Sequence, residues 1–125
     1  MNRIICFNCQ ESLEKYLKAC MIQYNFPVPK THDLVEIVEY LENKDFSFNE
    51  IKPYCNLIST YGTPARYPSF DLDITDDLTE YLVKSLDKCR GFILDVLKDY
   101  VQEESLNKEE IITDIQAEEE EEDEL

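Results

Sequence analysis

Four basic side chains within the first 66 residues have the types needed to hold an anion. Lys15 and Lys18 lie in one segment, His32 opens the next, and Arg66 follows a third. Phosphate and carboxylate groups are bound well by fixed cationic donors, and arginine adds a planar fork that holds two oxygens. A helix N-terminus next to His32 would add backbone N–H donors. If the fold brings these side chains together, the sequence predicts an anion-binding site.

Each of these residues also has a structural interpretation. His32 and Asp33 precede an apolar segment and can cap a helix. Arg66 can instead pair with a carboxylate such as Glu14 and tie its loop to the first segment. Tyr67 and the proline after it can serve packing and loop geometry, and the two lysines can be solvated helix residues. The residue types alone leave both interpretations open.

Other kinds of site are not indicated. Cys6 and Cys9 form a C-x-x-C pair, but zinc needs two further ligands, and the chain has one histidine and no second closely spaced cysteine pair. We find no Gly-rich phosphate loop and no nucleophile elbow, and Asp71 with Asp73 is too common a pairing to define a site. We expect no metal, no cofactor and no enzyme acting alone, with the five cysteines as buried, reduced thiols.

The net charge of -16 is unevenly distributed along the chain. Twelve of the 28 acidic residues and one of the 12 basic residues lie from Glu103 onward, so residues 1–102 carry a net charge of -5. This part has no basic stripe, and the acidic end would repel duplex nucleic acid, which disfavours general DNA binding. Neither a run of about 20 apolar residues nor a signal peptide is present, so we expect a cytoplasmic protein without membrane association.

Apolar residues recur at steps of three and four along four segments, which predicts an all-α fold with four main helices. The first helix is expected over residues 4–25, with Gln10 and Glu14 on its solvated face. The second is expected over residues 32–43 with Thr31 as its N-cap. Two prolines in the FPVPK stretch separate these helices.

The third expected helix has a capping box made by Ser47 and Glu50, with Phe46 before the cap packing on the first turn. Pro53 implies either that this helix begins nearer residue 49 or that it is kinked. Gly62 is expected to end it.

Thr75 caps the fourth expected helix, whose apolar stripe runs to Tyr100. We therefore predict a helical domain over residues 1–103, a linker or short helix over 104–117, and a disordered acidic tail over 118–125.

Three sequence pieces carry a family resemblance: CQESLEKYLKACM, PKTHDLVEIV and ARYP. In this order and at these separations they resemble the HEPN domain, a helical bundle named for nucleotide binding in higher eukaryotes and prokaryotes. The resemblance implies an up-and-down antiparallel bundle, a homodimer, and in many members a minimal nucleotidyltransferase partner in a toxin-antitoxin module. Because of their charge, Lys15, Lys18, His32 and Arg66 are our candidates for nucleotide or phosphate binding, with Gln10, Glu14, Asp33 and Tyr67 as supporting residues.

The chain departs from this family in two ways. Members usually have a further amphipathic helix before the QESLEK helix, so we expect exposed apolar stripes that a partner or second copy would cover. Nuclease members use an R-x4-6-H motif, whereas His32 follows Arg3 by 29 residues and precedes Arg66 by 34. We therefore expect a non-catalytic nucleotide-binding or partner-binding subunit. The alternatives are a HEPN ribonuclease toxin with a non-standard site and a purely structural dimerisation module.

Overall fold

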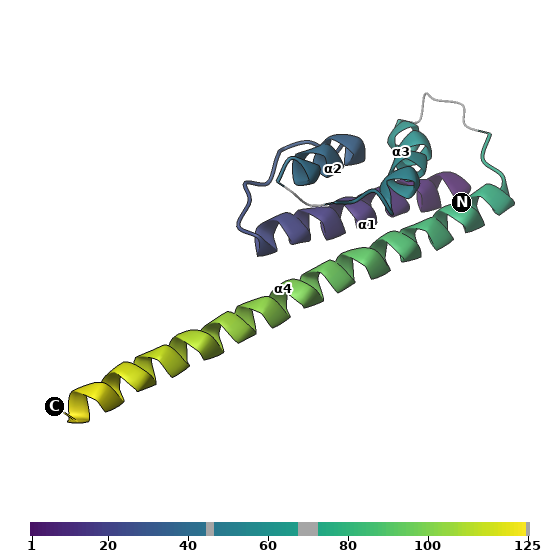
Figure 1. Ribbon diagram of the computed structural model, residues 1–125. Helices are drawn as coiled ribbons and strands as arrows, with labels where there is room; N and C mark the ends of the chain where they lie inside the picture. The colour runs from purple at the N-terminus through teal and green to yellow at the C-terminus, as the bar shows by residue number, and fades with distance from the viewer. Residues whose placement is uncertain (45–46, 68–72, 125) are drawn as a thin grey trace. The chain divides into compact units, whose positions relative to one another are not determined.

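The computed structural model describes residues 1–44, 47–67 and 73–124, with the backbone alone for residues 101 and 120–124. The described residues form four helices and no strand, which confirms the all-α fold (Figure 1). These are α1 (Asn2–Gln23), α2 (Leu34–Glu42), α3 (Lys52–Ala65) and α4 (Asp76–Glu124). The chain divides into two compact units, which are Met1–Leu94 and Asp95–Leu125. In the first unit α1, α2 and α3 pack on one another.

Helix α1 packs most extensively on α3 and also contacts α2. Its expected apolar stripe is confirmed, with Leu13, Leu17 and Cys20 completely buried. The prediction that Gln10 and Glu14 lie on a solvated face was wrong, because they are only 1% and 6% exposed. Packing on two sides covers more of the helix than a one-sided amphipathic pattern predicts.

Helix α2 begins two residues later than the cap assignment predicted. The Asp33 carboxylate accepts a hydrogen bond from the Val35 backbone N–H at 3.0 Å, so Asp33 is the N-cap. The Thr31 hydroxyl instead accepts from the Asp33 N–H and donates to Glu36. Thr31 therefore shapes the turn before the helix, and its assignment as the cap was wrong.

Helix α3 begins at Lys52, so Pro53 falls in its first turn, where a missing N–H removes no helical hydrogen bond. The predicted capping box was wrong. Ile51 is the N-cap and makes no side-chain cap bond, while the Phe48 carbonyl accepts from Ile51 and Lys52. The predicted packing of Phe46 lies outside the described residues.

Gly62 lies inside α3, which continues to Ala65, so the prediction that it ends the helix was wrong. A Cβ added at Gly62 would lie 2.5 Å from the Cβ of Gln10 and 3.0 Å from the Cys6 carbonyl oxygen. The absence of a side chain at this position lets α3 approach α1 closely. Gly62 is therefore a packing residue.

Helix α4 starts as predicted, since the Thr75 hydroxyl accepts from the Leu78 N–H at 3.1 Å. Within the first unit its Leu82, Cys89 and Ile93 side chains are completely buried. Phe92 meets Phe48 edge-on with ring centroids 5.5 Å apart. The regular apolar stripe of this segment is thus the part of α4 that completes the core.

The second unit is the remainder of α4, which stays helical through Glu124. The helix therefore runs through residues 104–117, where a linker or short helix was predicted, and continues to Glu124 in the segment predicted as an acidic tail. Neither glycine nor proline follows Gly91, and glutamate, glutamine and alanine favour helix, so no residue here stops it. Residues 102–119 are all exposed, which means that this stretch is helical without a core of its own.

Two further features bear on the kinds of site available. No helix in the described residues is long and apolar enough to cross a membrane. The five cysteines are buried free thiols. Burial raises the pKa of Cys9 and of Cys20 to about 11, so these thiols stay protonated and unreactive at neutral pH.

Candidate functional site

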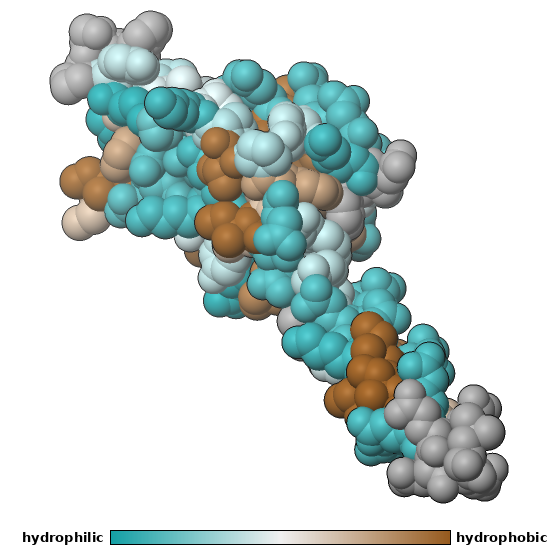
Figure 2. Space-filling model, turned by 90° about the vertical axis from the view of Figure 1, so that its left-hand side faces the viewer, coloured by the Kyte–Doolittle hydropathy of each residue, from teal (hydrophilic) through white to brown (hydrophobic). Residues whose placement is uncertain are grey.

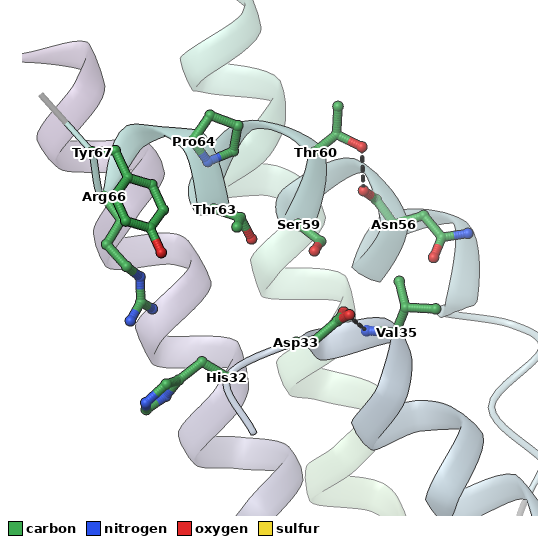
Figure 3. A pocket seen from close by; sticks show the side chains of 10 residues that line it. All are labelled: His32, Asp33, Val35, Asn56, Ser59, Thr60, Thr63, Pro64, Arg66 and Tyr67. Carbon is green, nitrogen blue, oxygen red and sulfur yellow. Dashed lines mark hydrogen bonds between the residues drawn. The ribbon is translucent and has the colours of Figure 1, made fainter. Parts of the chain in front are cut away.

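A pocket of about 570 Å³ opens between the start of α2 and the exposed side of α3. Figure 3 shows hydroxyl and amide side chains along α3, with the Arg66 guanidinium and the His32 imidazole at one end. The lining residues are His32, Asp33, Val35, Asn56, Ser59, Thr60, Thr63, Pro64, Arg66 and Tyr67. Most of the lining residues carry polar groups, with both charges among them, while their carbon atoms also provide apolar surface, a combination that suits a small ligand with polar groups.

His32 is held by two buried side chains of α1. Its Nδ1 lies 2.9 Å from one Glu14 carboxylate oxygen and 3.1 Å from the other. The Gln10 amide nitrogen donates to the His32 carbonyl at 2.8 Å. The His32 side chain is 61% exposed, whereas that of Glu14 is 8% exposed. The contact at Nδ1 thus orients the imidazole and leaves Nε2 available to a ligand.

Glu14 has a second basic partner, because the Lys18 ammonium lies 3.4 Å from its other oxygen. This is the ordinary i, i+4 arrangement on a helix surface. Lys18 supports the carboxylate that holds His32, and it is not among the described residues that line the pocket.

Arg66 is positioned by α1 from the other side. Its Nη2 donates to a Glu11 carboxylate oxygen at 2.5 Å, and its guanidinium carbon lies 5.4 Å from the centre of the Phe7 ring. The carboxylate partner is therefore Glu11, whereas the sequence suggested one such as Glu14. A guanidinium has five N–H donors, so the Glu11 contact leaves donors for a bound anion.

The structure brings seven of the eight predicted site residues together in or beside the pocket and leaves Lys15 apart. His32, Asp33, Arg66 and Tyr67 line the pocket, and Tyr67 also accepts a hydrogen bond from Arg3 through its carbonyl oxygen. Gln10 and Glu14 contact His32 from α1, and Lys18 pairs with Glu14. Lys15 is exposed on α1 and has no contact with these residues among those described. The pocket therefore gathers one arginine and one histidine, and neither lysine.

A polar row on α3 completes the pocket and was missed from the sequence. Asn56, Ser59, Thr60 and Thr63 recur at steps of three and four, so they share one side of the helix. Thr60 donates to the Asn56 carbonyl at 2.7 Å, which fixes its hydroxyl. The polar periodicity on the side of α3 opposite its apolar stripe was the available signal.

The N-terminus of α2 is less open to an anion than the sequence suggested. The Asp33 and Val35 N–H groups already donate to Thr31 and Asp33 side chains. The Asp33 carboxylate also brings negative charge to the pocket wall. An anionic ligand would therefore bind near Arg66 and His32, away from Asp33.

These features define a small all-α domain with a surface pocket between the start of α2 and the exposed side of α3. Comparison with protein families identifies the group, since the HEPN domain model matches residues 2–100. The chain therefore belongs to the HEPN domain family, as the three sequence pieces indicated. No curated protein and no solved structure matches the chain significantly.

Proposed function

We propose that this chain is a non-catalytic HEPN subunit that binds a nucleotide in the pocket beside α3. In this proposal Arg66 and His32 hold a phosphate, and the polar row of α3 binds the sugar or base. The observation that carries the proposal is the convergence of an arginine, a histidine and a row of hydroxyl groups on one pocket.

The size and the electrostatics of the pocket support a nucleotide ligand. A volume of about 570 Å³ falls within the range of about 300 to 1,000 Å³ that is usual for small-molecule sites. Ser59, Thr60 and Thr63 can both donate and accept hydrogen bonds, as ribose hydroxyls and base edges require. Arg66 supplies the charge that a phosphate needs at one end.

The proposed partners are a second copy of the chain and a nucleotidyltransferase, in a toxin-antitoxin module as implied by the family. The proposed compartment is the cytoplasm, where reducing conditions suit five free thiols. Co-purification of the chain with the product of a neighbouring nucleotidyltransferase gene tests the partner, and sedimentation of the purified chain tests the dimer.

Substitution at Arg66 tests nucleotide binding. With ATP and AMP as calorimetric probes, Arg66→Ala should weaken binding by about 1.5 to 3 kcal/mol, the usual range for a charged hydrogen bond. Arg66→Lys should restore only part of the loss, because lysine lacks the planar fork. Arg90→Ala is the matched control, since this exposed arginine pairs with Asp87 outside the pocket lining. Equal affinity for the native chain and Arg66→Ala would refute the phosphate role.

Glu11→Gln separates a binding role from a structural role for Arg66. The Glu11 carboxylate competes with a phosphate for the same guanidinium. If Arg66 binds phosphate, removing this charge should tighten nucleotide binding several-fold. If Arg66 only ties its loop to α1, the substitution lowers the melting temperature and leaves nucleotide affinity unchanged.

One observation favours a ribonuclease as the second candidate. His32 and Arg66, 34 residues apart in sequence, line the same pocket, and Glu14 holds Nδ1 of the imidazole as in a general base. The R-x4-6-H spacing of nuclease members is absent from the chain, which makes the non-catalytic role the first choice. RNA cleavage by the purified chain that is lost in His32→Ala would establish the ribonuclease instead.

A further inference from the structure

The second unit exposes an apolar patch on an otherwise acidic helix. Ile111, Ile112 and Ile115 are 57%, 54% and 50% exposed. At 100° per residue they span about 100° of the helix circumference, so they form one continuous patch. Figure 2 shows apolar surface of this kind near the C-terminal end of the helix, with hydrophilic surface on both sides. We call these three residues the isoleucine patch.

Charge around the isoleucine patch is predominantly negative, and Lys108 is the one basic residue of this segment. Residues 103–125 contain twelve acidic residues and one lysine. Glu110 directly precedes Ile111, and Asp114 lies between Ile112 and Ile115; both are exposed. A partner that covers the isoleucines must therefore bring its own rim close to several carboxylates.

This charge pattern selects the kind of partner. A second copy of the segment would place like charges opposite one another, and an anionic membrane surface would repel the helix in the same way. A protein groove with an apolar floor and a rim of lysine or arginine can bury the isoleucines and pair with the carboxylates around them. Helix-in-groove recognition of this kind uses anchors at steps of one, three and four.

We propose that the second unit is a docking helix for such a protein, with the isoleucine patch as its anchor. The helix is already formed in the free chain, so binding does not have to order it. The three isoleucines provide affinity through burial, and the acidic residues provide orientation and a fast encounter with a basic rim. This role is independent of nucleotide binding, which depends on residues of the first unit.

A synthetic helical peptide of leucine and lysine, with its leucines on one face, is the probe for this surface. We expect the full chain to bind it in calorimetry. A leucine and glutamate peptide of the same pattern should not bind. Ile112→Gln, which keeps a good helix former, should weaken binding by about tenfold, as expected for losing one buried aliphatic side chain. Replacing all three isoleucines by glutamine should weaken it by at least about 100-fold.

Leu106→Gln is the matched control. Leu106 is 61% exposed on the same helix, but it lies five residues before Ile111 and therefore about 140° away from it. This substitution should change affinity by less than about twofold. Circular dichroism of each variant, with unchanged helicity, shows that the helix persists.

Two results would overturn the proposal. If the triple variant binds the leucine and lysine peptide as tightly as the native chain, charge alone drives the interaction and the patch is not an anchor. If the native chain sediments as a dimer and the triple variant as a monomer, a second copy already covers the patch.

Discussion

Helix α4 has the same kind of apolar periodicity in two different environments. In the first unit Leu82, Cys89 and Ile93 are completely buried, whereas Ile111 and Ile115 in the second unit are at least half exposed. The first segment is helical and packed, and the second is helical and solvated. The comparison shows that periodicity indicates which residues share a face, but not whether anything covers that face.

The two segments are also stabilised differently. The packed segment gains free energy from burial and from contacts such as that of Phe92 with Phe48. The solvated segment depends on helix propensity and on bonds within the helix, such as Tyr100 donating to Glu104 at 2.6 Å. Isolated helices are marginal in water, so the second segment should melt more easily than the first.

Truncation of an α4 isoleucine in each unit should give the largest difference in stability. Ile93→Ala removes a completely buried side chain and should lower the free energy of unfolding by about 2 to 5 kcal/mol. Ile112→Ala removes an exposed side chain and should change it by less than about 0.5 kcal/mol. Urea denaturation followed by circular dichroism measures both. Similar losses would mean that the isoleucine patch is covered within the chain itself.

The two glycines provide the next largest contrast. Gly62→Ala would place a Cβ 2.5 Å from the Gln10 Cβ, and this overpacking should cost about 1 to 3 kcal/mol. A Cβ at Gly91 meets nothing within 4 Å, so Gly91→Ala should stabilise the helix by up to about 1 kcal/mol. Thermal melts of the two variants should therefore shift in opposite directions. A stabilising Gly62→Ala would contradict the close approach of α1 and α3.

Much of the fold could be predicted because local signals agreed with the packing. Thr75 was the expected cap of α4, and the apolar stripes identified the core residues of α1 and α2. The predictions that were wrong failed because of contacts between helices. Gln10 is polar and yet buried, because helices cover α1 on two sides. Gly62 serves an interhelical contact, which no local turn signal reveals.

The candidate site was predicted in outline. His32 and Arg66 line one pocket, but their separation in sequence gave no information about distance. The Glu11 partner of Arg66 could not be chosen from several carboxylates without knowing which face of α1 meets the end of α3. Lys15 was grouped with the site because of its charge, but it directly follows Glu14, and consecutive residues of a helix point about 100° apart.

Loss of the Asp33 cap should have an intermediate effect on the stability of the first unit. Asp33→Ala removes the side-chain acceptor of the Val35 N–H and should lower the free energy of unfolding by about 1 kcal/mol. Asp33→Asn retains an acceptor and should recover most of this loss. Because Asp33 also adds negative charge to the pocket wall, both variants should bind a phosphate ligand at least as well as the native chain. Weaker ligand binding in Asp33→Asn would instead indicate that the carboxylate itself contacts the ligand.

Removal of residues 103–125 should have the smallest effect on the stability of the first unit. The described side chains of this segment, residues 103–119, are exposed, so the truncation takes no apolar contact from the core. It also reduces the net charge from -16 to -5, which lessens self-repulsion at low ionic strength. In 0.15 M salt the melting temperature should therefore stay within about 2 °C of that of the full chain, because screening already suppresses the repulsion. In low salt the truncated chain should melt at a slightly higher temperature than the full chain. A melting temperature lowered by more than a few degrees at both salt concentrations would mean that the second unit packs on the first, and the isoleucine patch would then be an internal contact.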